Sequence, residues 1–291
     1  MGLSALAIAF LVGLAEQPEP DVHALQVEQR AFIEDLVAHS PHGRSAPHER
    51  DLARDFLVAK LSEAGIGAER WRYRHPNVHP VIDMIIPPFS GANIVATIPA
   101  TEPGGEVVLL GAHFDTEADS PGADDNATGL SALFVIAKAI ADEPVRSRTL
   151  MIAMFDEEEE DRIGSRALAR QLTQDDVALH SMHSLDMAGW DGDSDNLIAV
   201  DAPDDAWLSF YQERARPLGV TVTAAHYDSS DHVSFRDVGI PAMVMGEAFP
   251  QGDYSPHRHK PTDTPETVNY LYLALNTHLM HAVIHDLVVE P

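Results

Sequence analysis

Four short segments of the sequence concentrate histidine and carboxylate side chains, the residue types that hold transition metals in proteins. They carry His113, Asp115 and Asp125; Glu157 to Glu160; Asp186; and His257 and His259. The chain has no cysteine, so thiolate ligands, disulfides and cysteine nucleophiles are excluded. A metal bound here must therefore be held by nitrogen and oxygen donors, a set that suits zinc or a similar divalent ion.

The spacing H-x-D places His113 and Asp115 on one face of an extended strand, because successive side chains of a strand alternate between faces. The histidine can then bind a metal while the aspartate accepts its second ring N–H and orients it. Taken alone, the H-x-D pattern is weak evidence for a metal site. Asp125 precedes Asn126 and Gly129 and could equally cap a helix.

The run of four glutamates follows an apolar segment that reads as a buried strand. Charge runs are usually solvated turns. At a strand end, however, inward-facing carboxylates would meet a metal. Two neighbouring carboxylates could then divide the work, with one binding the ion and the other acting as general base on a water molecule.

The elements that must position these residues follow from the spacing of apolar residues. Strands are predicted at residues 93–98, 107–112, 149–155, 183–187, 197–200, 220–224 and 241–245. Helices are predicted around residues 31–37 and 52–61, and at 128–141, 165–172, 206–218 and 265–287. This alternation predicts a single α/β domain with a central, mostly parallel (mixed) sheet and helices on both faces. Ligand sites in such folds lie at the C-terminal ends of strands, where the four segments fall.

Composition narrows the expected partners and location. The 291 residues include 46 acidic and 19 basic side chains, a net charge of −27, so nucleic acid and membrane surfaces are not expected partners. The apolar run Met1–Ala15 resembles a signal peptide, and a Pro-rich break follows to residue 21. We therefore expect export to a periplasm or the medium, with the catalytic domain over residues 22–291. Because no Lys or Arg opens the run, an apolar helix packed on a cytoplasmic domain is the alternative.

The ordered motifs resemble those of the bacterial two-zinc aminopeptidases, whose fold is shared by glutaminyl cyclases and glutamate carboxypeptidases. They are H-x-D, G-A-D-D-N-A-T-G, E-E followed by G-S, L-D-M, S-D-H and H-x-x-x-D-T, in register over roughly residues 93–269. The resemblance implies a zinc-exopeptidase-like fold, two Zn²⁺ ions per chain and peptide substrates with a free N-terminus. It leaves the oligomeric state unknown.

Carried over by motif, the resemblance implies metal ligands at His113, Asp125, Glu159, Asp186 and His259. Asp125 would bridge the two ions and Asp115 would orient His113. Counting back from the G-S pair makes Glu158 the general base. The same count leaves Glu157 and Glu160 without a role. Because Asp125 is the aspartate that immediately precedes N-A-T-G, Asp124 is expected to be structural.

Four further residues match the family less closely. Tyr227 falls where some members place a tyrosine that polarises the scissile carbonyl, while Asp231 and Asp263 would support the site. Arg258 stands where cyclases typically carry tryptophan, which disfavours cyclase activity. A carboxypeptidase would need a basic pocket, for which Arg258 is the single candidate. A non-catalytic metal-binding domain is the least favoured alternative, because every expected ligand and the base are present.

Overall fold

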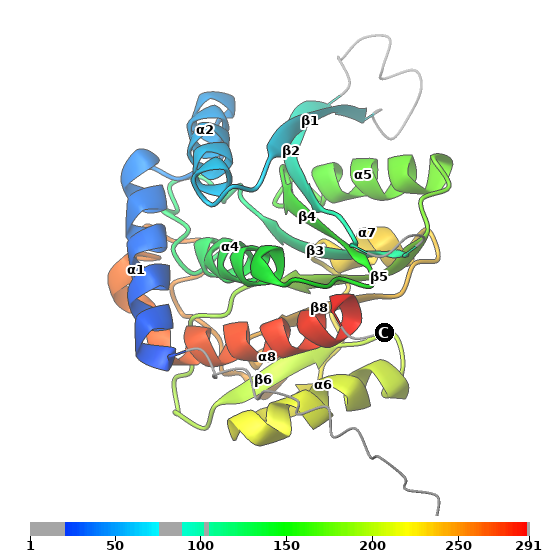
Figure 1. Cartoon of the computed structure of the whole chain (residues 1–291). Coiled ribbons are helices and arrows are strands. Elements are labelled where there is room, and N and C mark those ends of the chain that lie inside the picture. Colours follow the sequence, from blue (N-terminus) through cyan, green and yellow to red (C-terminus); the bar gives the residue numbers. More distant parts are fainter. Residues whose placement is uncertain (1–20, 76–88, 102–104, 290–291) are drawn as a thin grey trace, which may run out of the picture.

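The computed structural model describes residues 21–75, 89–101 and 105–289, and in this part of the chain eight strands form one sheet (Figure 1). Their order is β1-β2-β4-β3-β5-β8-β6-β7. The strands are β1 Ala68–His75, β2 Phe89–Ile98, β3 Val107–His113, β4 Thr149–Phe155, β5 Leu179–Leu185, β6 Leu197–Asp201, β7 Thr221–Ala224 and β8 Ala242–Gly246. The helices are α1 Val22–His39, α2 Pro47–Glu63, α4 Ala127–Asp142, α5 Ile163–Gln174, α6 Asp205–Leu218, α7 His232–Arg236 and α8 Tyr270–Val288.

The sheet is mixed, and its centre is parallel. β3 pairs in parallel with both β4 and β5, and β5 pairs in parallel with β8. The pairs β1–β2, β2–β4 and β6–β8 are antiparallel. The predicted α/β domain with a mostly parallel mixed sheet is thus confirmed. Its parallel centre places the C-terminal ends of β3, β4 and β5 at one edge.

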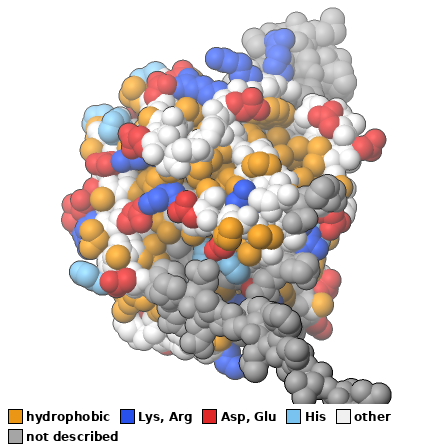
Figure 2. Space-filling model, viewed as in Figure 1, with side chains coloured by type: hydrophobic (Ala, Val, Ile, Leu, Met, Phe, Trp, Pro, Cys, Tyr) orange, Lys and Arg blue, Asp and Glu red, His pale blue; other side chains and the backbone are white. Residues whose placement is uncertain are grey.

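Both faces of the sheet are covered, as the nearly continuous apolar runs of β3 and β4 require. Val108 and Leu110 of β3 face a core that includes residues of α1, α2, α4, α6 and α8. Leu109, between them, faces a second core built with α5 and α7. Figure 1 shows α1, α4 and α8 on one side of the sheet, with α5 and α7 toward the other. Figure 2 shows apolar side chains interspersed with charged ones on the first of these faces.

Several boundaries differ from the sequence prediction. β1 was not predicted, although its segment AERWRYRH alternates charged with aromatic residues as a half-buried strand does, and it occupies an edge of the sheet. α8 begins at Tyr270 rather than at residue 265, since Pro265–Thr267 forms a 3₁₀ turn first. Asn269 then caps the helix, its side chain accepting the N–H of Tyr272. The short α7, at His232–Arg236, was also missed.

The apolar run at residues 1–15 lies outside the described residues, so the export signal stays a prediction. Among the helices of the described ranges, none combines the length and the apolar character needed to cross a bilayer.

Candidate metal centre

The predicted ligands converge at the edge where β3, β4 and β5 end. His113 is the last residue of β3, Glu159 lies in the turn after β4, and Asp186 directly follows β5. Asp125 comes from the loop that ends at Asn126, the N-cap of α4. His259 reaches the same place from the long connection between β8 and α8. Parallel pairing of three neighbouring strands is therefore what brings these distant segments together.

Asp125 lies at the centre of the group, with each carboxylate oxygen facing a different histidine. Its Oδ1 is 3.3 Å from His113 Nε2, and its Oδ2 is 3.1 Å from His259 Nε2. His113 Nε2 is also 3.4 Å from Asp186 Oδ1, and His259 Nε2 is 3.2 Å from Glu159 Oε2. The five side chains thus form two nitrogen–oxygen groups that share one carboxylate.

The donors fit a bound metal ion. Ligand atoms of His113, Asp125 and Glu159 all lie within 4.8 Å of one another, and the same holds for Glu117, Glu159 and His259. Within the described ranges, the buried atoms His259 Nε2 and Glu159 Oε1 have no hydrogen-bond partner of acceptable geometry. Buried polar atoms in native proteins are normally satisfied, and a cation bound between these two atoms would satisfy both of them. Histidine nitrogens and carboxylate oxygens are the ligands of zinc sites that lack cysteine.

Asp115 joins two of the site segments. The hydrogen-bond partner of His113 Nδ1 is the backbone carbonyl of Asp115, at 3.2 Å. The Asp115 carboxylate, which was expected to orient the ring, has its Oδ1 3.7 Å from Nδ1, beyond hydrogen-bond distance. The same carboxylate accepts the backbone N–H of Glu158 at 3.0 Å and that of Glu159 at 3.1 Å. These two hydrogen bonds to the backbone were not predicted, and they fix the turn at Glu158 and Glu159 relative to β3.

Glu158 lines the open hollow that also contains His113, Asp125, Glu159, Asp186 and His259. Burial raises the pKa of its carboxyl well above the ordinary value, and the positive charge of His113 opposes this shift. A divalent cation in the hollow would also oppose this rise. The side chain is therefore placed to accept a proton from a group held between the ligands.

Two arginines of α2 hold the residues before Glu158. Arg50 pairs with Asp156 Oδ1 at 2.9 Å and with Glu157 Oε1 at 3.0 Å, while Arg54 pairs with the other oxygen of Asp156. The Tyr73 hydroxyl donates to Glu157 Oε2 at 2.9 Å. Glu157 is therefore a buried anchor of the turn, which corrects the expectation that it has no role. Glu160 is exposed.

Arg44 is a further residue that the sequence patterns did not reveal. Its guanidinium is fully buried and donates to the carbonyls of Phe114, Pro121 and Gly122, in the loop that carries Asp115 and Asp125. Burial lowers its pKa to about 10, so the side chain still carries its charge at neutral pH. No periodicity marks such a residue, because its partners lie about seventy positions away along the chain.

The residues expected to support the site do surround it. The carboxylate of Asp263 accepts the backbone N–H of Asp124 at 2.8 Å and that of Asp125 at 3.1 Å. The Asp124 side chain accepts the N–H of Gly189 at 2.9 Å, which joins the Asp125 loop to the segment after Asp186. Asp231 is buried behind the hollow, where burial raises its pKa to about 7.

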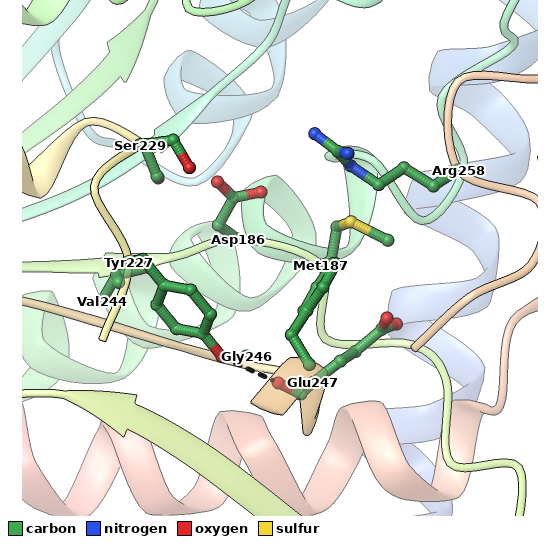
Figure 3. A pocket seen from close by; sticks show the side chains of 10 residues that line it. Asp186, Met187, Tyr227, Ser229, Val244, Gly246, Glu247 and Arg258 are labelled. Atoms are coloured by element: carbon green, nitrogen blue, oxygen red, sulfur yellow. Dashed lines mark hydrogen bonds between the residues drawn. The ribbon is translucent and has the colours of Figure 1, made fainter. Parts of the chain in front are cut away.

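A smaller cavity adjoins the hollow (Figure 3). Tyr227 lines it, and its hydroxyl donates to the Glu247 carbonyl at 3.2 Å. Asp186 and Arg258 line both the cavity and the hollow. The structure therefore brings Tyr227 and Arg258 to opposite sides of one compartment next to the ligands.

The chain matches a family model over residues 93–284, that of Peptidase family M28. It is 26% identical over 224 residues to a probable leucine aminopeptidase of Arthroderma benhamiae, covering 71% of this chain and 60% of that protein. It is also 26% identical over 190 residues to the aminopeptidase YwaD of Bacillus subtilis, covering 63% of this chain and 41% of that protein. The chain thus spans less than two thirds of the length of these relatives.

Solved structures share the fold. The zinc aminopeptidase BSAP from Bacillus subtilis superposes with a TM-score of 0.81 over 91% of this chain and 95% of that chain, at 13% identity. The glutaminyl cyclase of Bacteroides thetaiotaomicron superposes with a TM-score of 0.73 over 90% of this chain and 97% of that chain, at 15% identity. At these identities the likeness establishes the fold alone.

Proposed function

The chain belongs to peptidase family M28, and we propose that it is a zinc-dependent aminopeptidase that hydrolyses the N-terminal bond of peptides with a free amine. The observation that carries the proposal is the position of Asp125, whose two oxygens face His113 and His259 separately. A carboxylate so placed suits a bridge between two cations, the arrangement found in two-metal hydrolytic sites.

In this proposal His113 and Asp186 would hold one zinc ion, Glu159 and His259 would hold a second, and Asp125 would contribute to both sites. Zinc bound there would supply Lewis acidity, polarising a carbonyl and lowering the pKa of water. Asp115 keeps His113 and the Glu158–Glu159 turn in a fixed relation, so the base and the ligands hold their positions together.

Glu158 acts as the general base. It takes a proton from the water that attacks the scissile carbonyl carbon, and it returns this proton to the nitrogen of the leaving amine. Its place in the hollow beside all five ligands supports this role. Tyr227 lines the cavity beside Asp186, and its hydroxyl, which donates to the Glu247 carbonyl in this structure, would donate to the oxyanion during turnover.

The free α-amine of the substrate is a cation, and we place it in the hollow beside the ligands, where further carboxylates surround it. Glu117, Asp161 and Asp228 line the hollow around the ligands. The net charge of −27 also favours the approach of cationic groups. Specificity for an N-terminal amine is expected to come from these groups.

The test is hydrolysis of aminoacyl-p-nitroanilides by protein whose zinc content has been measured. We expect release that a chelator abolishes, that added zinc restores and that N-acetylation of the substrate prevents. Cyclisation of an N-terminal glutaminyl peptide and release of a C-terminal residue are assayed in parallel. Activity in either parallel assay, without release from free-amine substrates, would replace the aminopeptidase proposal. Two bound zinc ions without turnover of any substrate would instead favour a non-catalytic metal-binding domain.

A further inference from the structure

Arg258 lies where the ligand hollow meets a separate cavity of about 230 Å³. The two spaces share Asp186, Ser229, Ser230 and Arg258. Because Asp186 is a proposed metal ligand, a group seated in the cavity lies directly beside the reacting centre. Figure 3 shows the Arg258 guanidinium on the same side as Asp186 and Ser229, with Tyr227 and Glu247 on the opposite side.

We propose that Arg258 is a specificity-determining residue that binds the side-chain carboxylate of substrates beginning with glutamate or aspartate. This inference rests on the proposed aminopeptidase function and assigns the cavity to the first side chain of the substrate. The volume suits one amino-acid side chain rather than a peptide segment.

The lining of the cavity suits both the methylene groups and the carboxylate of an acidic side chain. Met187, Val244 and Phe249 offer apolar surface for the methylene groups. Tyr227, Ser229 and Ser230 contribute hydroxyl groups to the same lining. Arg258 is the one Lys or Arg among the described residues of this lining. It can therefore donate to a carboxylate with both charge and paired N–H groups.

The Arg258 guanidinium has N–H groups available to bind a substrate. Its Nε lies 3.6 Å from Asp125 Oδ2, and its side chain remains 45% exposed. Among the described residues, its guanidinium makes no hydrogen bond that meets distance and angle criteria. Asp125 is also the proposed bridging ligand, so its negative charge is shared with cations when the centre is loaded. A substrate carboxylate then becomes the better partner for the guanidinium.

The acidic residues that line the cavity do not compete with a substrate carboxylate for the Arg258 guanidinium. Glu247 is completely buried, and its Oε2 accepts the N–H of Ser255 at 2.8 Å, so the carboxyl is held within the protein. Asp186 belongs to the metal ligands. An N-terminal lysine or arginine would bring a second cation against Arg258, and such substrates are expected to be poor.

The inference is tested with p-nitroanilides of glutamate, glutamine, leucine and lysine, which keep a free amine and lack a C-terminal carboxylate. We expect kcat/KM for glutamate to exceed that for glutamine, its neutral isostere, by about 10- to 100-fold, the range of a charge-assisted hydrogen bond. Arg258→Gln should remove this preference, so that kcat/KM for glutamate and for glutamine agree within about threefold in the variant, and Arg258→Lys should keep part of it. Arg162→Gln is the matched control, because Arg162 lines the ligand hollow but not the cavity.

Binding supplies a second measurement that needs no turnover. Calorimetry with free L-glutamate and L-glutamine should show tighter binding of glutamate to the wild-type protein, and equal binding to Arg258→Gln. Hydrolysis of leucine substrates without a glutamate preference would overturn the inference and leave the proposed function standing. If no substrate is hydrolysed, the proposed function fails, and equal binding of the two amino acids to the wild-type protein would overturn the role of Arg258 as well.

Discussion

The carboxylate of Asp115 accepts the backbone N–H of Glu159 at 3.1 Å, which ties the end of β3 to the turn after β4. The same carboxylate stands 3.7 Å from the His113 ring. The Asp115 carboxylate therefore positions a proposed glutamate ligand and, through the N–H of Glu158, the proposed base. The backbone carbonyl of the same residue contacts the proposed ligand His113 at 3.2 Å.

Asp115→Asn is expected to weaken zinc binding and activity together. The amide keeps one acceptor oxygen but loses the negative charge, so it cannot accept both backbone N–H groups equally well. Loss of an outer-shell partner typically lowers metal affinity or activity about 10- to 100-fold. Competition with a chromogenic chelator measures affinity, and p-nitroanilide hydrolysis measures activity. Glu160→Gln, an exposed change in the same segment, serves as control; an equal effect of both variants would remove Asp115 from this role.

Glu158→Gln is expected to separate metal binding from turnover. The amide cannot accept a proton, so kcat should fall by about 10² to 10⁴, while zinc content and unfolding temperature stay near the wild-type values. Glu159→Gln should differ by losing zinc, because Glu159 Oε2 faces His259. Metal analysis after gel filtration and steady-state kinetics provide the comparison. Full activity in Glu158→Gln would assign the base elsewhere.

Arg50→Ala is expected to destabilise the fold. It leaves Asp156 and Glu157 buried with one partner fewer, and breaking a buried ion pair from one side costs about 3–5 kcal/mol. Arg166→Ala removes an ion pair to Asp161, whose side chain is 66% exposed, and should cost about 1 kcal/mol or less. Urea unfolding monitored by circular dichroism measures the loss of stability in both variants. Similar midpoints for the two variants would contradict the anchoring role of Arg50.

His183 is expected to make stability fall in mild acid. It is fully buried between the hydroxyls of Tyr211 and Ser181, and burial lowers its pKa to about 3. The unfolded chain, with a pKa near 6.5, then binds more protons between these two values, so the free energy of unfolding decreases as pH falls from about 6.5 toward 3.

The limiting slope for this one group is about 1.4 kcal/mol per pH unit, or roughly 2 kcal/mol between pH 7 and pH 5. Chemical unfolding at the two pH values measures it in the wild-type protein and in His183→Gln, which cannot take up the proton. The variant should show the smaller difference. The exposed His226→Gln is the control, and it should behave like the wild-type protein. Identical pH dependence in all three would show that His183 is not the group responsible.

The sequence by itself determined the α/β class, the strand ends at which chemistry occurs and the order of the candidate ligands. These are local properties. Apolar periodicity sets which face of a strand or helix is buried, and the motifs mark positions along one segment at a time. Residues such as His113 and Asp186 could therefore be named before any contact between them was known.

Only the tertiary structure decided which distant side chains hold the site in place. Arg44, Arg50 and the second role of Asp115 depend on partners far along the chain, and Glu157 changed from a surface charge to a buried anchor for the same reason. The cavity that Arg258 lines likewise forms from four separate segments. Buried charges are stable only where such partners meet them. This meeting is set by how the strands pair in three dimensions, which no local pattern of residues encodes.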